Sequence, residues 1–174
     1  MESKYNYLKL ISSPKVISEA MRYFGINEIK GSASNSTIMQ WAKEVGVEKV
    51  YTNDDIAWCG LFVAKVIQKA GFAPVKDPLW AANWSKFGTK QSEAMLGDVL
   101  VFKRNGGGHV GFYVGEDSAY YHVLGGNQSD SVNIMRIAKN RCVAIRRCQW
   151  KVSQPPEVKK IILEAKGVVS MNEA

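Results

Sequence analysis

Apolar residues recur at helical spacing in three stretches of the first half of the chain, and each stretch is followed by a glycine. A glycine directly after the last apolar position is a typical helix end, and the proline that opens the first stretch favours a first helical turn. The pattern therefore predicts helices over residues 14–24, 36–45 and 56–70.

The second half alternates apolar and polar residues in short segments, separated by turns rich in Gly, Asn, Asp and Ser. Such segments predict five β-strands, over residues 98–103, 109–115, 119–124, 132–137 and 142–149. Because helices precede strands along the chain, we expect an α+β fold, with N-terminal helices packed on a segregated antiparallel sheet of about five strands. The connection at 72–91 contains two prolines and two tryptophans and is expected to line a cleft.

Length and composition indicate how many domains to expect. The chain has 174 residues, of which 46% are hydrophobic, enough for one well-filled core. We therefore expect a single domain over residues 1–150. Residues 151–174 open with two prolines and then place apolar residues at helical spacing, which predicts a helical extension.

The three cysteines are an odd number, which favours free thiols over a disulfide framework. Cys142 and Cys148 lie in one predicted extended segment, and we interpret both as small buried apolar residues. Cys59 falls in the first turn of the third predicted helix. Unpaired backbone N–H groups at that end lower the pKa of a thiol and can stabilise an oxyanion. Taken alone, Cys59 also fits a buried core cysteine.

A candidate base for Cys59 comes from the two histidines of the chain. His109 opens a predicted strand directly after three glycines, which leave one side of its imidazole uncovered. A strand edge that faces a helix start can bring a base to a thiol. A structural histidine at a strand start is the alternative interpretation.

A third residue is expected to orient the imidazole. If the hairpin turns at residues 115–118, His109 lies opposite residue 124 or 125, and the next polar side chain is Asn127. Its amide oxygen can accept the imidazole N–H, although Asn127 also fits a turn residue with an unusual backbone angle. A tighter turn, centred on residues 115 and 116, would instead make His122 the partner.

Three blocks of sequence, taken in order, resemble a known group of enzymes. Residues 54–63 surround Cys59, residues 97–102 form the strand before the histidine, and residues 108–115 form the histidine strand. Their order and spacing are similar to those of the bacterial and phage cell-wall cysteine amidohydrolases and peptidases of the CHAP and NlpC-like type, a papain-like superfamily. The resemblance covers about residues 14–150. Residues 28–31, 35–38 and 124–128 are also similar to a phage-associated branch.

The resemblance implies a papain-like α+β fold with Cys59 as nucleophile, His109 as base and Asn127 as the orienting residue. Many CHAP members have an acidic residue two positions before that asparagine, where this chain has Gly125. NlpC-like members often carry a histidine on the same strand, which keeps His122 as the alternative.

Acidic and aromatic residues surround the expected site. Asp54 and Asp55 precede the nucleophile helix, where they are expected to cap it; the alternative is that one binds the free amino group of a stem peptide. Two adjacent aspartates make a poor calcium loop, so we predict no metal and no cofactor. Four aromatic residues are candidates for the cleft lining or for the core: Trp58, Trp80, Trp84 and Tyr113.

These observations predict a hydrolase that cuts an amide bond of bacterial peptidoglycan, either between muramic acid and L-alanine or within the stem peptide. The formal net charge of +7 suits an anionic cell wall as well as nucleic acid, and the resemblance favours the cell wall. The first residues lack the apolar run of a signal peptide, and no segment is long enough to span a membrane. We therefore expect no membrane insertion, and a monomeric phage lysin in the host cytoplasm before its release to the cell wall or periplasm. The alternative is a toxin delivered by secretion machinery.

Two rival functions come from other classes. One is a non-catalytic cell-wall or virion module that keeps the fold and uses its groove only for binding. The other is a thiol hydrolase that acts on protein or lipid amides. An intact Cys59 and His109 favour the peptidoglycan hydrolase over the binding module.

Overall fold

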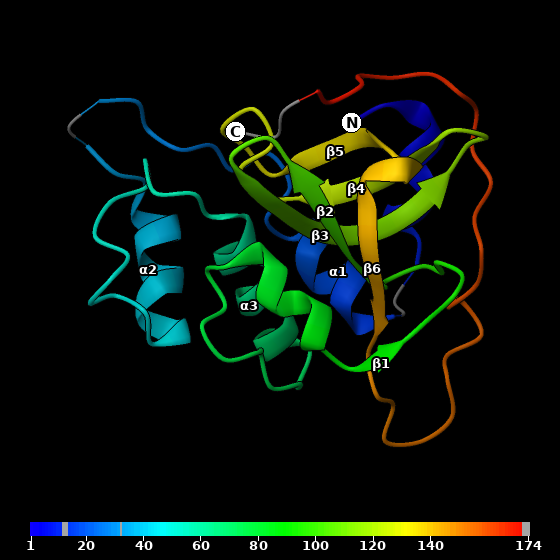
Figure 1. Ribbon diagram of the computed structural model, residues 1–174, viewed down its shortest axis with the longest axis horizontal. Helices are drawn as coiled ribbons and strands as arrows, with labels where there is room; N and C mark the ends of the chain where they lie inside the picture. The colour runs from blue at the N-terminus through cyan, green and yellow to red at the C-terminus, as the bar shows by residue number, and fades with distance from the viewer. Residues whose placement is uncertain (12–13, 32, 172–174) are drawn as a thin grey trace.

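The computed structural model describes residues 1–11, 14–31 and 33–171, and it confirms the α+β fold (Figure 1). The helical elements are η1 (Ser3–Lys9), α1 (Lys15–Met21), α2 (Ser36–Val45), α3 (Cys59–Lys69), η2 (Ala81–Lys86) and η3 (Lys139–Arg141). The strands are β1 (Thr89–Lys90), β2 (Val99–Arg104), β3 (Gly107–Glu116), β4 (Tyr120–Gly125), β5 (Asn133–Ala138) and β6 (Cys142–Arg147).

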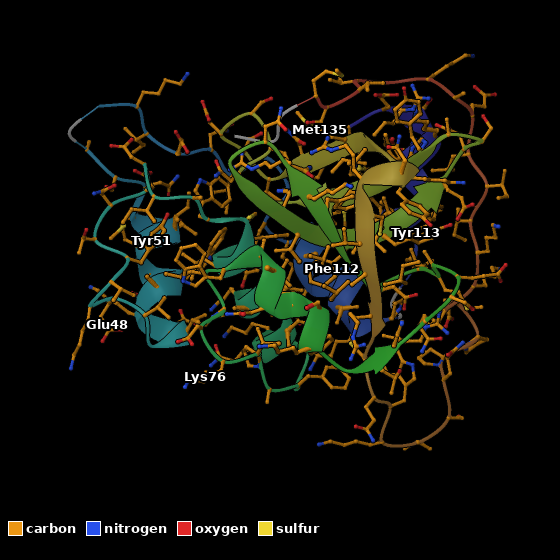
Figure 2. The ribbon with its side chains drawn as sticks, in the orientation of Figure 1. Glu48, Tyr51, Lys76, Phe112, Tyr113 and Met135 are labelled. Carbon is orange, nitrogen blue, oxygen red and sulfur yellow. The ribbon has the colours of Figure 1, made fainter. Side chains whose placement is uncertain are left out.

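The strands form one antiparallel sheet in the order β1-β6-β2-β3-β4-β5. Successive side chains of a strand point to opposite faces, and β3 follows this rule closely. Phe112 belongs to the large core on the helix-covered face, and Tyr113 belongs to a smaller cluster on the other face (Figure 2). Strand β3 thus contributes side chains to both apolar clusters, one on each face of the sheet.

Helix α3 is the central helix of the fold. Every residue from Cys59 to Ile67 is buried, because α1 and α2 pack against this helix while β3 covers another side (Figure 1). The buried ammonium group of Lys65 is paired with Glu44 of α2. A helix that is apolar on all sides is stable only in such an enclosed position. Its first residue, Cys59, is therefore held firmly relative to the sheet.

The predicted helices and strands agree with the structure to different degrees. Helix α2 has the predicted bounds, and Gly46 ends it with φ +81°. The other two helices are shorter than predicted, because 22–25 and 56–58 form turns and loops. The five predicted strands are present within one or two residues at each end, and the two-residue strand β1 was not predicted.

The helix predicted within residues 151–174 is wrong for the described part of that segment. Residues 151–171 run in extended and turn conformations around the sheet, and Ile162 and Val169 form parallel bridges to Glu116 and Arg136 (Figure 1). Strand β5 is an edge of the sheet, so its unpaired backbone groups offer the segment hydrogen bonds that a short isolated helix lacks. Among the described residues, no helix is long and apolar enough to cross a membrane.

Close packing at Gly60 supports a stability prediction. A Cβ atom at residue 60 would lie 2.2 Å from the carbonyl oxygen of Pro78, a backbone atom that cannot swing away. Gly60→Ala should therefore lower the free energy of unfolding by about 1–3 kcal/mol, measured by urea denaturation. Gly107→Ala is the matched control, because its Cβ would meet only a side-chain atom of Arg104 at 3.9 Å. Equal stability of the two variants would contradict this account.

Candidate active site

The start of α3 places the Cys59 thiol against strand β3. Cys59 is the first residue of the helix and is 5% exposed. The backbone N–H groups of Val110 and Gly60 act to lower the pKa of its thiol. Since Val110 directly follows His109 and α3 packs against β3, Cys59 lies near the start of the strand that carries the predicted base.

The electrostatic environment of Cys59 differs from the prediction. Burial raises the pKa of the Cys59 thiol, and this outweighs the opposing effects of the Val110 and Gly60 N–H groups and of the Arg104 charge. The prediction that the helix start lowers the pKa is therefore wrong for the resting protein. A neutral thiol is a weak nucleophile, so this site needs a base that removes the proton during attack.

The imidazole of His109 is buried and contacts an amide side chain. Its Nε2 lies 3.0 Å from Oε1 of Gln128, and its ring is tilted by 31° relative to that of Phe102, with centroids 6.4 Å apart. Sequence reasoning missed Gln128. The only signal was its place within the residues 124–128 that resemble the phage-associated branch.

Hydrogen bonds around Gln128 determine which atom faces His109. The Gln128 amide nitrogen donates to Val123 O at 3.2 Å, to Asn133 O at 2.8 Å and to Asn133 Oδ1 at 3.0 Å. All three are acceptors, so the NH₂ group must point toward them and Oε1 toward the imidazole. His109 Nε2 therefore carries a proton that it donates to Gln128. The lone pair then belongs to Nδ1, the nitrogen able to accept a proton from a thiol.

The hydrogen bond expected from Asn127 is thus made by the next residue, which corrects that prediction. Asn127 has φ +54°, which agrees with the alternative interpretation of Asn127 as a turn residue with an unusual backbone angle. The space beside the imidazole belongs to Gly125 and Gln128. A Cβ atom at Gly125 would lie 3.1 Å from His109 Nε2 and 2.7 Å from Gln128 Oε1. In this chain the Gln128 amide fills the place that a side chain at residue 125 would enter.

The hairpin register explains the error. Strands β3 and β4 pair Glu116 with Tyr121, so the turn closes later than predicted, and an irregularity at residues 113–115 shifts the register again before Phe112 pairs with Leu124. Continuing that pairing by three residues sets His109 level with Asn127, beyond the end of β4. The chain turns there, and the side chain that folds back onto His109 is that of Gln128.

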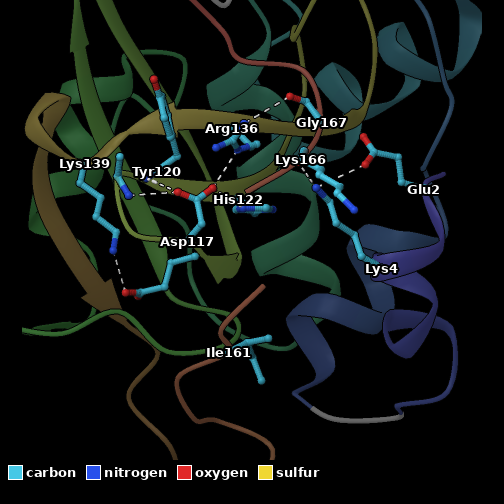
Figure 3. Close-up of polar contacts among 12 residues, drawn as sticks. Glu2, Lys4, Asp117, Tyr120, His122, Arg136, Lys139, Ile161, Lys166 and Gly167 are labelled. Atoms are coloured by element: carbon cyan, nitrogen blue, oxygen red, sulfur yellow. Dashed lines mark hydrogen bonds and ion pairs between the residues drawn. The ribbon is translucent and has the colours of Figure 1, made fainter. Parts of the chain in front are cut away.

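His122 belongs to a separate buried cluster, so the alternative that made it the partner of His109 is wrong. Its Nε2 lies 3.0 Å from Asp117 Oδ2 (Figure 3). Its Nδ1 lies 2.7 Å from Tyr5 Oη. A carboxylate only accepts, so His122 Nε2–H donates to Asp117 and the Tyr5 hydroxyl donates to Nδ1. Arg136 also donates to Asp117, at 2.8 Å. The cluster joins η1 to the sheet.

This cluster predicts a loss of stability on acidification. Burial lowers the pKa of His122 below its ordinary 6.5. As the pH falls through 6.5 the unfolded chain therefore takes up a proton that the folded protein does not bind, and folding becomes less favourable. We expect the urea midpoint to fall between pH 7 and pH 5, and His122→Phe to flatten that slope while lowering stability at pH 7 by about 1–3 kcal/mol. Parallel slopes for the two proteins would contradict the assignment.

Asp54 does not cap α3, which corrects another prediction. Its carboxylate accepts from the backbone N–H groups of Ile29 at 3.0 Å and Asn35 at 2.8 Å. Burial acts to raise the pKa of this carboxyl, but the hydrogen bonds from Asn35 and Ile29 hold it below its ordinary value. Asp54 therefore anchors the 29–35 loop beside the nucleophile helix. Asp55 is exposed and does not cap α3 either, because among the described residues no side chain caps this helix start. The alternative, that one of the two aspartates binds an amino group, stays a prediction.

The four aromatic candidates separate into core and surface. Trp58, Trp84 and Tyr113 are completely buried, whereas Trp80 is 72% exposed. The other two cysteines are free thiols as predicted, with Cys148 buried and Cys142 half-buried. Burial raises the pKa of Cys142 to about 11 and that of Cys148 to about 12.

Comparison with known protein families matches residues 51–127 to the CHAP domain. The match includes Cys59 and His109 and ends at Asn127, one residue before the amide that contacts the imidazole. A search of curated proteins gives no match. CHAP domains are in general hydrolases that act on peptidoglycan. The matched segment, which contains the start of α3 and the start of β3, is similar to CHAP domains.

Proposed function

We propose that this protein hydrolyses an amide bond of bacterial peptidoglycan, with Cys59 as nucleophile and His109 as general base. One observation carries the proposal. Within the segment that matches the CHAP domain, helix α3, which begins at Cys59, packs against β3, which carries His109 near its start. Acyl transfer by cysteine requires a thiol within reach of a histidine that can accept its proton, and this packing is what supports the two roles.

The proposed reaction is acyl transfer through a thioester. His109 Nδ1 takes the thiol proton as the Cys59 sulfur attacks the amide carbon, and backbone N–H groups at the start of α3 stabilise the oxyanion. The imidazolium then protonates the leaving amine, and the C–N bond breaks. A water molecule, deprotonated by His109, hydrolyses the thioester and restores the thiol.

We assign the orienting role to Gln128 rather than to Asn127. The support is the 3.0 Å contact with His109 Nε2 and the three acceptors that keep the amide from flipping. Gln128 is neutral, so it fixes the ring without stabilising an imidazolium by charge. This suits a resting site in which burial also keeps the Cys59 thiol neutral.

The bond that is cut is either the muramoyl–alanine amide or a peptide bond of the stem peptide. A net charge of +7 favours association with an anionic cell wall. Phage origin, a host-cytoplasmic stage and the monomeric state stay predictions.

The test is the release of soluble fragments from purified peptidoglycan, identified by mass spectrometry. New amino groups on intact stem peptides, with free lactyl carboxylates on the glycan, would identify an amidase. New termini within the peptide would identify an endopeptidase. The rival non-catalytic module predicts co-sedimentation with peptidoglycan and no fragments. Absence of fragments, together with cleavage of a protein or lipid amide, would overturn the assignment in favour of the other thiol hydrolase.

A further inference from the structure

A short segment of chain joins the two halves of the candidate active site. The carbonyl oxygens of Pro78 and Leu79 lie against Gly60 in the first turn of α3, where a Cβ atom would come within 2.2 and 2.9 Å of them. The Cβ of Ala81 would lie 3.3 Å from a Cβ atom placed at Gly108, next to His109. Trp80 therefore sits between the Cys59 helix and the His109 strand.

Trp80 is exposed at this position and forms part of a groove. Its neighbours on both sides are half-buried or buried, yet 72% of Trp80 is accessible. The groove has a volume of about 660 Å³, within the range of small-ligand sites, and its walls include Val50, Ile56, Ala57 and Leu79. Ile56 and Ala57 lie three and two residues before Cys59, so one wall of the groove is the loop that enters α3.

The lining of the groove indicates the chemistry of its occupant. Asp77 is the one ionisable residue among the lining residues, and the rest are apolar side chains or glycine. Stem peptides carry several carboxylates and amino groups, which need charged partners when they are desolvated. An N-acetylated sugar is neutral, and its ring has an apolar face that can stack on an indole while its acetyl methyl contacts apolar walls.

We propose that this Trp80 groove binds an N-acetylated pyranose ring of the glycan strand, stacked on the indole of Trp80. The inference rests on the proposed function, and it narrows the choice of the bond that is cut. A sugar held against the loop that enters α3 leaves the amide attached to that sugar nearer to Cys59 than the bonds deeper in the stem peptide, which favours cleavage of the muramoyl–alanine bond.

Binding can be measured without hydrolysis in the Cys59→Ala protein. The probes are a tetramer of N-acetylglucosamine and, separately, a free stem peptide, with the indole N–H signals followed by NMR. We expect the sugar to shift the Trp80 signal, and Trp80→Ala in the same background to weaken its affinity about tenfold. Val152→Ala is the matched control, because Val152 is an apolar side chain that is 88% exposed, and it should leave the affinity unchanged.

Three outcomes would overturn the sugar assignment: no sugar binding, sugar binding that survives Trp80→Ala, or a Trp80 shift produced by the stem peptide alone. These results are separate from the fate of the proposed function, which depends on fragment release by the protein with Cys59 intact. Fragment release without sugar binding would contradict only the assignment of the groove. Sugar binding without fragment release would support the assignment of the groove and contradict the proposed hydrolase activity.

Discussion

Replacing Cys59 by alanine is expected to abolish the release of fragments from peptidoglycan, a loss of about a millionfold in turnover if the nucleophile acts as in other acyl-transfer enzymes. The thiol is the one group in the proposed mechanism that forms a covalent bond with the substrate. Cys59 is 5% exposed, but its replacement by alanine removes only the sulfur atom. The cavity is therefore small, and the fold should persist. The measurement is the rate of fragment release by mass spectrometry, with circular dichroism as a check on folding.

Cys142→Ala is the matched control for the loss of a thiol. Cys142 is half-buried and free, and burial raises its pKa to about 11, so it shares the chemistry of Cys59 without its position. This variant should release fragments at the normal rate. Equal rates for the natural protein and Cys59→Ala would show that the thiol is not the nucleophile, and the proposed mechanism would then be wrong.

Gln128→Ala should lower kcat/KM about a hundredfold, the usual cost of losing a partner that orients an active-site histidine. Without the Gln128 oxygen, the imidazole can place its proton on either nitrogen, and the Nδ1–H tautomer cannot accept from the thiol. The 15N chemical shifts of His109 report the tautomer directly. A merely structural role of Gln128 would lower stability without changing that tautomer.

Two further variants sharpen this prediction. Gln128→Glu keeps an acceptor and adds a negative charge, which favours the protonated imidazole and should move the acidic limb of the pH–rate profile to higher pH. Asn127→Gly is the matched control, because glycine adopts the φ of +54° without strain. It should retain nearly full activity. Loss of activity in Asn127→Gly with retention in Gln128→Ala would return the orienting role to Asn127.

Features that depend on neighbouring residues could be predicted from the sequence. Helix α2 has its predicted bounds because its apolar spacing and the left-handed Gly46 are local properties. Cys59 at a helix start and His109 near a strand start follow from the same kind of signal. The alternation of apolar residues gave five strands to within two residues, since it directly reflects which side chains face the core.

Features that depend on distant contacts were decided only by the tertiary structure. The late hairpin turn and the irregularity before Gly115 make Gln128, rather than Asn127 or His122, the partner of His109. Residues 151–171 lie along the sheet because its edge offers backbone hydrogen bonds.

The surroundings of the aromatic and sulfur groups also follow from packing. Trp58 and Trp80 are the same residue type, yet one is enclosed by helices and the other is exposed beside the site. Burial of Cys59 outweighs the field of its own helix and keeps the thiol neutral. The local pattern thus determined which residues could carry the chemistry. The fold decided their partners and charge states, because register, burial and desolvation are set by contacts between residues far apart in the chain.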